Sequence, residues 1–321
     1  MCPFYMNFCD NLFSDQSISS VYDLPFVPST LFKDLDLKSI HEDDIYKTMV
    51  SSGTTGQQRS KIFLNKATAS AQQRALTRIV TSALGTSRVP MLVMDSISQI
   101  KDRTSFSARG AGILGFMMFG TKRSFALDER SKMCMESIKK FSSLKTEQTK
   151  FLFGFTAIIW EEILQFLESG SAILGDQEAV LIHGGGWKKL AEKNIDNRIF
   201  LREVKSKLGV NVEVIDYYGM VEQTGSIFLA DEEGVFSTNE YNDIIIRDPK
   251  TLRALPNGSV GVAQVLSVLP ESYPGFSILT EDLGCILRDE VSSNGSIKKR
   301  FVIKGRMPKT EIRGCGNTYE R

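Results

Sequence analysis

The chain has 321 residues, 42% of them hydrophobic and 24% charged, a composition that excludes an intrinsically disordered or fibrous protein. This length fits one large α/β unit or two smaller domains. The net charge is only +1, without the broad basic surface of a duplex-binding protein, so we expect no nucleic-acid partner. The most apolar stretch, 151–167, contains Glu161 and Glu162 and is therefore no membrane span, and the N-terminus lacks the pattern of a secretion signal. We expect a cytoplasmic protein.

Helices and strands alternate over the first two thirds of the chain. The spacing of apolar residues predicts a helix over 68–84 that ends at Gly85, because glycine accepts the positive φ of a helix end. A second helix is expected to begin with Thr156 as its cap, and a third covers 200–208. The side chains of the second helix that we expect to point inward are Ile159, Ile163, Phe166 and Leu167.

Short apolar runs between these helices predict buried strands over 90–94, 151–153, 180–182 and 212–215. Such strands, alternating with helices, imply a parallel sheet covered on both faces. Beyond Gly234 the pattern changes to short strands separated by turn signals, over 244–246, 260–269, 284–288 and 299–303. The fold class predicted is α/β, with an antiparallel β portion appended to the parallel core.

A loop rich in hydroxyl groups and glycine is the most informative segment. It lies between the apolar pair Met49-Val50 and the apolar run 62–64. Free backbone N–H groups and short hydroxyl donors are what a polyphosphate requires of a loop, although a surface loop without function is the common alternative. The loop residues are Ser51, Ser52, Gly53, Thr54, Thr55 and Gly56.

A second candidate element follows the predicted strand 212–215. Tyr218 and Gly219 come first, and Glu222 stands three residues later. They place an aromatic face and a hard oxygen ligand at the carboxyl end of a parallel strand, where open α/β sheets bind ligands. The alternative is that Tyr217 and Tyr218 are core aromatics and Glu222 a surface acid.

Three further glycine or acidic motifs stand along the chain. Gly184, Gly185 and Gly186 follow His183, and glycine is needed where backbone approaches a flat ring closely. Asp282 lies in a Thr-Glu-Asp-Leu-Gly segment, and Lys304-Gly305-Arg306 comes later. Residues 110–115 satisfy the dinucleotide pattern GxGxxG, but they follow a polar segment instead of a strand, so we interpret them as tight backbone packing.

These elements, in this order, resemble the adenylate-forming superfamily, whose enzymes join a carboxylate to AMP. The resemblance implies that the loop 51–56 binds the phosphates of ATP and that Glu222 helps hold Mg²⁺. It also implies that Tyr218 lies on the adenine, with the 184–186 turn beside it, and that Asp282 binds the ribose hydroxyls. It implies that Arg306 marks the junction to a small C-terminal domain. The chain departs from the superfamily pattern at Gln57-Gln58, where Lys-Pro is usual, and at Val221, where a hydroxyl residue is usual.

Nearly the whole chain, from PFVPSTLFKDLDL to GRMPKTEIRGCGNTYER, resembles the acyl-protein synthetase family of bacterial luminescence operons. The resemblance implies a ligase that uses ATP to activate a long-chain fatty acid. The acyl group then passes to a cysteine near the C-terminus and on to a partner reductase or another acyl acceptor protein. It also implies additional N-terminal residues, so that this chain begins late.

Cys315 matches the acceptor cysteine of that family. A thiolate attacks an acyl-adenylate well, and Lys309 and Arg313 lie near enough in sequence to favour the thiolate. An incidental terminal cysteine is the alternative. The cysteines at 2, 9, 134 and 285 have no matching role, and their spacing argues against zinc and a disulfide framework.

The last segment of the chain is basic. From Lys298 to Arg321 there are eight Lys or Arg against two Glu, which indicates either a local anion site or a solvated terminus. We divide the chain into an adenylation domain, 1–303, and a short basic tail, 304–321, with the superfamily's small C-terminal domain reduced or absent. That domain normally supplies a catalytic lysine, and here the candidates are Lys61, Lys304 and Lys309, or a partner's residue.

Three alternatives stay open at this point. The chain could be an acyl-CoA or acyl-carrier-protein ligase with an abbreviated C-terminus, or a nucleotide-binding subunit without catalysis. His183 could act as a general base, although adenylation of an ionised carboxylate needs none.

Overall fold

One long sheet runs through the molecule. The computed structural model describes residues 2–13, 18–51, 59–86, 88–101, 108–185, 187–291 and 295–307. From one edge to the other, the strands are β11 (Asn242–Arg247), β12 (Gly261–Ser267), β13 (Ser277–Val291), β14 (Ile297–Arg306), β10 (Phe236–Ser237), β9 (Phe228–Ala230), β8 (Val212–Tyr218), β7 (Ala179–Gly184), β6 (Lys150–Phe155), β4 (Val89–Ser96) and β5 (Gly120–Leu127).

Strands β5, β4, β6, β7 and β8 are parallel, and helices cover both of their faces. Alternate side chains of each strand enter two separate cores. On β4, Leu92 packs with α5 (Met135–Ser142) and α8 (Asn197–Lys207), whereas Val93 packs with α3 (Lys66–Leu84) and α4 (Ala108–Met117). The parallel core predicted from the alternation of helices and strands is therefore confirmed.

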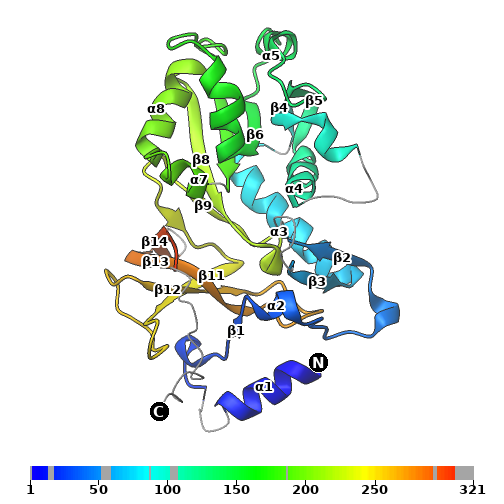
Figure 1. Ribbon diagram of the computed structural model, residues 1–321, viewed down its shortest axis with the longest axis vertical. Coiled ribbons are helices and arrows are strands. Elements are labelled where there is room, and N and C mark those ends of the chain that lie inside the picture. Colours follow the sequence, from blue (N-terminus) through cyan, green and yellow to red (C-terminus); the bar gives the residue numbers. More distant parts are fainter. Residues whose placement is uncertain are drawn as a thin grey trace, which may run out of the picture.

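From β9 onward the sheet is antiparallel and forms the other half of the molecule. The short strand β1 (Val27–Pro28) pairs with β13 in parallel, and α2 (Leu31–Asp34) and the hairpin of β2 (Lys47–Val50) and β3 (Lys61–Leu64) pack on this half. Figure 1 shows the parallel half with its helices above, the antiparallel half below, and α1 (Pro3–Phe13) at the lower end. The appended antiparallel portion is thus confirmed as well.

The remaining helical segments are short. They are η1 (Val21–Asp23), η2 (Glu42–Asp44), η3 (Ile97–Ile100), α6 (Thr156–Ile158), η4 (Ile159–Ile163), η5 (Leu164–Phe166), α7 (Trp187–Ala191) and η6 (Val221–Gln223).

The helix expected after Thr156 differs from the prediction in two ways. It continues from α6 into one π-helical stretch, η4, which holds more residues per turn than an α-helix. The phase of the buried face therefore shifts: Ile159, Ile163 and Leu167 are buried as predicted, but Leu164 is buried in place of Phe166, which is 60% exposed. The hydroxyl of Thr156 does not cap this helix, because its Oγ1 shares a hydrogen bond of 2.9 Å with His183 Nδ1.

Other predicted elements are present with shifted ends. Helix α3 ends at Gly85, whose φ is +68°. Strand β13 begins at Ser277, so the Thr-Glu-Asp-Leu-Gly segment lies inside a strand, and β14 continues to Arg306, past the proposed domain boundary at 303.

The GxGxxG residues lie within α4, where a Cβ on Gly112 would stand 3.1 Å from the Phe155 ring, so this motif serves backbone packing. Within the described ranges, no helix combines the length and the apolar character that crossing a membrane requires.

Candidate nucleotide site at the carboxyl edge of the sheet

The glycine turn after β7 and the tyrosine segment of β8 lie at the same edge of the sheet. His183 stands opposite Asp216 in the parallel register, which places Gly184 beside Tyr217. A Cβ on Gly184 would lie 2.6 Å from the Tyr217 carbonyl oxygen, and Gly185 has a φ of +74°. Gly184 is thus required by the close approach of β8, and Gly185 by the turn. Gly186 falls outside the described residues.

Tyr218, Asp282 and Arg306 meet in one cluster. The Tyr218 hydroxyl donates a hydrogen bond of 2.7 Å to Asp282 Oδ2, and Arg306 Nε lies 3.4 Å from Asp282 Oδ1. Asp282 and Arg306 face each other directly in the β13–β14 pair. Burial, followed by the negative charge of Asp282, raises the pKa of Tyr218 well above its ordinary value, so the phenol keeps its proton and acts as a donor. Gly219 continues from Tyr218 into the next segment, η6.

Glu222, in η6, is the buried carboxylate of the site. It is 7% exposed, and burial raises its pKa. A hydrogen bond from the Ser60 side chain and the positive charges of Lys33 and Arg306 act in the opposite direction. A hydrogen-bond donor and two cations thus favour the ionised form of this carboxylate and oppose the effect of burial.

Ser60 connects Glu222 to the hydroxyl-rich loop. Ser51 N donates to Ser60 O, and Ser60 N donates to Ser51 Oγ, both at 2.9 Å, so the two serines close the neck of the loop. Ser52, Gly53, Thr54, Thr55 and Gly56 fall outside the described residues. The sequence prediction omitted Ser60, although a hydroxyl residue directly before β3 was the signal that could have identified it.

The backbone of the Glu222 segment is fixed by buried side chains. The Tyr273 hydroxyl donates to the Glu222 carbonyl oxygen at 2.9 Å and accepts from Gln72 Nε2 of α3 at 3.1 Å. Gln223 Nε2 donates to the carbonyl oxygens of Val265 and Gly275. These contacts fix the backbone that carries the Glu222 side chain, which favours preorganisation of the site. No sequence signal identified Tyr273 or Gln72.

The donor set suits Mg²⁺ bound together with phosphates. The described residues contain no group of three or more His, Cys, Asp or Glu side chains that could hold a metal ion by themselves. Mg²⁺ is commonly held by one or two carboxylates and by substrate phosphates, and Glu222 supplies one such carboxylate.

The lysines proposed from the sequence lie in different surroundings. Lys61 Nζ is 3.3 Å from Asp36 Oδ1, and both side chains are about half exposed. Lys304 is exposed and is the extra residue of a β-bulge, because Gly284 faces Ile303 and Leu283 faces Gly305. Lys309 and Cys315 fall outside the described residues. Lys299 and Arg300 of the basic segment form ion pairs with Asp243 and Asp231.

His183 is placed as a core residue. Its side chain has no exposed surface, its Nδ1 bonds to Thr156, and burial lowers its pKa to about 3. A general base works best with a pKa near the operating pH, so these surroundings do not favour that hypothesis.

Asp216, opposite His183, makes stability depend on pH. It accepts a hydrogen bond of 2.7 Å from Trp187 Nε1, and burial raises its pKa from 3.8 to about 7. Between these two values the folded state binds more protons than the unfolded state, so Asp216 opposes folding increasingly as pH rises. We expect Asp216→Asn, which still accepts from Trp187, to gain stability relative to the wild type from about pH 4 to 7. Urea denaturation of both proteins at several pH values in this range measures their free energies of unfolding. A difference between the two free energies that does not change with pH would contradict the prediction.

Comparison with known proteins identifies the family. The model of the acyl-protein synthetase family, LuxE, matches residues 1–321. The chain belongs to this family. It is 22% identical to the long-chain-fatty-acid–luciferin-component ligase of Vibrio harveyi, over 97% of this chain and 81% of that one. Membership confirms the family that the motifs predicted, and with it the ligase class.

Solved structures confirm the adenylate-forming fold. A 2-hydroxyisobutyryl-CoA ligase in the postadenylation state with R3-HIB-AMP matches 95% of this chain at 15% identity and a TM-score of 0.67. ATP-bound MatB from Rhodopseudomonas palustris matches 83% at 17% identity and a TM-score of 0.53. The chain spans 64% and 49% of the lengths of these two proteins. At these identities the likeness shows the fold alone.

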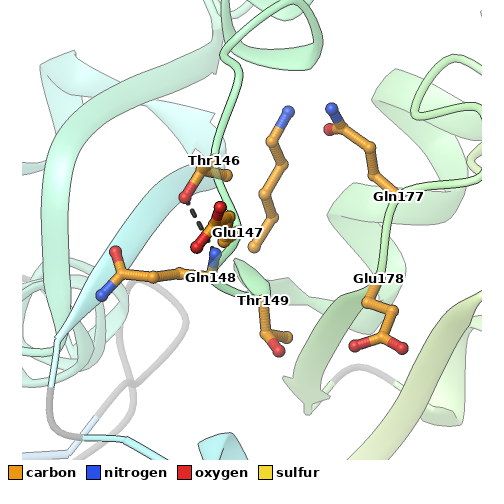
Figure 2. Close-up of a pocket in the computed structure, with 7 residues that line it drawn as sticks. Thr146, Glu147, Gln148, Thr149, Gln177 and Glu178 are labelled. Carbon is orange, nitrogen blue, oxygen red and sulfur yellow. Dashed lines mark hydrogen bonds between the residues drawn. The ribbon is translucent and has the colours of Figure 1, made fainter.

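A separate hollow lies at the opposite end of the parallel sheet. Thr146, Glu147, Gln148, Thr149, Lys150, Gln177 and Glu178 line it, at the amino ends of β6 and β7 (Figure 2). The buried ammonium of Lys150 donates to the carbonyl oxygens of Phe141 and Ser142 at the end of α5. Lys150 thus caps a helix, and the hollow holds none of the predicted site residues.

Proposed function

We propose that this chain activates a fatty acid with ATP as acyl-AMP, transfers the acyl group to its own Cys315, and passes it to a partner reductase or another acyl acceptor protein. The observation that carries the first step is the meeting of Tyr218, Asp282 and Arg306 beside Glu222 and the neck of the 51–60 loop. These residues come from β8, β13, β14, η6 and the 51–60 loop, and each has a chemical use in holding a nucleotide.

The first step requires positioning and charge neutralisation more than proton transfer. A carboxylate oxygen of the acid attacks the α-phosphorus, the bond to the bridging oxygen breaks, and pyrophosphate leaves with the bonding electrons. Because the acid is already ionised, no base is needed. Mg²⁺, when bound, neutralises charge on the phosphates.

Each residue of the cluster has a proposed role in this step. Tyr218 offers its ring to the adenine and Asp282 accepts from the ribose hydroxyls, since a carboxylate has lone pairs beyond those used by Tyr218 and Arg306. Glu222 would hold Mg²⁺, and the loop 51–56 would supply backbone donors to the phosphates.

The second step is thioester formation. The Cys315 thiolate attacks the acyl carbon of acyl-AMP, and AMP leaves as the phosphate anion. A long-chain fatty acid as the substrate is supported by the name of the Vibrio harveyi ligase, and a protein as the acyl acceptor by the description of the family as acyl-protein synthetases. The division into an adenylation domain, 1–303, and a tail, 304–321, that carries the thiol is part of the same proposal.

Acid-dependent exchange of labelled pyrophosphate into ATP tests the first step directly. We expect exchange with Mg²⁺ and fatty acids, and a panel of chain lengths identifies the preferred acid. Absence of exchange with every acid would favour a nucleotide-binding subunit without catalysis. Steady release of acyl-CoA when CoA is supplied, without a protein acceptor, would favour the acyl-CoA ligase alternative.

A further inference from the structure

We propose that Lys33 is a phosphate-binding residue of the adenylation site, whose ammonium group contacts the leaving pyrophosphate. The proposal rests on the proposed function and adds a residue of the N-terminal segment, to which the sequence motifs assigned no role.

Pairing between distant strands places Lys33 beside the site. Strand β1 pairs in parallel with Ile278 and Leu279 of β13, and Ser29 N donates to Leu279 O at 2.9 Å. Helix α2 follows directly, so it lies next to the part of β13 that carries Glu281 and Asp282. Lys33 Nζ is 3.5 Å from Glu281 Oε2.

A second contact fixes α2 against the Glu222 segment. Phe32 is buried and meets the Tyr273 ring edge-on, with the ring centroids 6.3 Å apart. The Tyr273 hydroxyl in turn donates to the Glu222 carbonyl oxygen.

The ion pair of Lys33 is one that a phosphate can replace. Lys33 and Glu281 are 36% and 38% exposed, and exposed pairs of this kind contribute little to stability. Two other lysines near α2 lie in different surroundings: Lys61 pairs with Asp36, and Lys38 pairs with Glu42 while lying over the Phe63 ring. Lys33 is the lysine of these three that pairs with a residue of β13, directly before Asp282.

The chemistry of the reaction gives such a cation a use. Negative charge develops on the bridging oxygen as pyrophosphate leaves, and a lysine ammonium supplies a compact charge with three donors. AMP lacks the β- and γ-phosphates, so Lys33 should distinguish ATP from AMP.

The test compares Lys33→Met and Lys33→Arg with two controls. Glu281→Gln removes the ion-pair partner but keeps the ammonium, and Lys205→Met removes a similarly exposed lysine that pairs with Glu232 at 2.7 Å. Two quantities are measured: the dissociation constants of ATP and AMP by calorimetry with Mg²⁺, and kcat and KM of pyrophosphate exchange.

We expect Lys33→Met to weaken ATP binding about 10- to 100-fold with AMP binding unchanged, and to lower kcat of exchange about 100-fold. Lys33→Arg should retain most of the ATP affinity and most of the kcat of exchange. The two controls, Glu281→Gln and Lys205→Met, should match the wild type in both quantities. The proposal is overturned if Lys33→Met weakens ATP and AMP equally, or if Glu281→Gln reproduces its effect, because Lys33 would then only hold α2 in place. If the wild type binds ATP but shows no exchange, the proposed function fails while the ATP-to-AMP comparison still decides the role of Lys33. If it binds no ATP, both fail.

Discussion

Replacing Glu222 by Gln is expected to lower acid-dependent pyrophosphate exchange about 100-fold or more, because the substitution removes the carboxylate that we propose as the Mg²⁺ ligand while keeping its shape. The apparent affinity for Mg²⁺ should fall in the same experiment. Glu213→Gln, on the exposed side of β8, is the matched control and should exchange like the wild type.

Although the Glu222→Gln substitution should lower activity, we do not expect it to lower the stability of the protein. Burial raises the folded-state pKa of Glu222 above its usual 4.5, so its ionisation opposes folding as pH rises above that value. The variant is therefore expected to melt at the same or a higher temperature than the wild type at pH 7 to 8. Exchange close to the wild-type rate would contradict the assigned role, and a clear drop in melting temperature would indicate that Glu222 is structural.

Replacing Cys315 by Ser is expected to abolish covalent acylation and to leave pyrophosphate exchange intact. The adenylate forms before the thiol acts, and a serine hydroxyl is a far weaker nucleophile than a thiolate at neutral pH. Intact-mass analysis after incubation with ATP, Mg²⁺ and a fatty acid measures the increment, and hydroxylamine should remove it from the wild type.

Cys134→Ser provides the control for this experiment, because Cys134 is a partly exposed free thiol in the described part of the chain. It should acylate normally. A hydroxylamine-labile increment that persists unchanged in Cys315→Ser would show that another residue accepts the acyl group. Loss of both exchange and acylation would instead place Cys315 in the first step.

Local patterns predicted the layers of this fold well. The end of α3 at Gly85, the buried strands of the parallel half and the change to antiparallel strands all follow from short-range periodicity and turn residues. The exposure of Phe166 could not be predicted in this way, because a single π-helical stretch moves the buried face and only packing decides where it forms. The role of Thr156 was missed for a similar reason, since its hydroxyl bonds to His183 on the neighbouring strand.

The sequence by itself determined the class of fold, the family and the residue types that suit a nucleotide, because these depend on order and spacing along the chain. Only the tertiary structure decided that the Tyr218 hydroxyl meets Asp282, that Ser60 reaches Glu222, and that Lys33 lies beside Glu281. Strand register decides such contacts by bringing together residues that are far apart in sequence. The pKa values of Glu222 and His183 follow from the same cause, since desolvation depends on which atoms surround a group after the chain has packed.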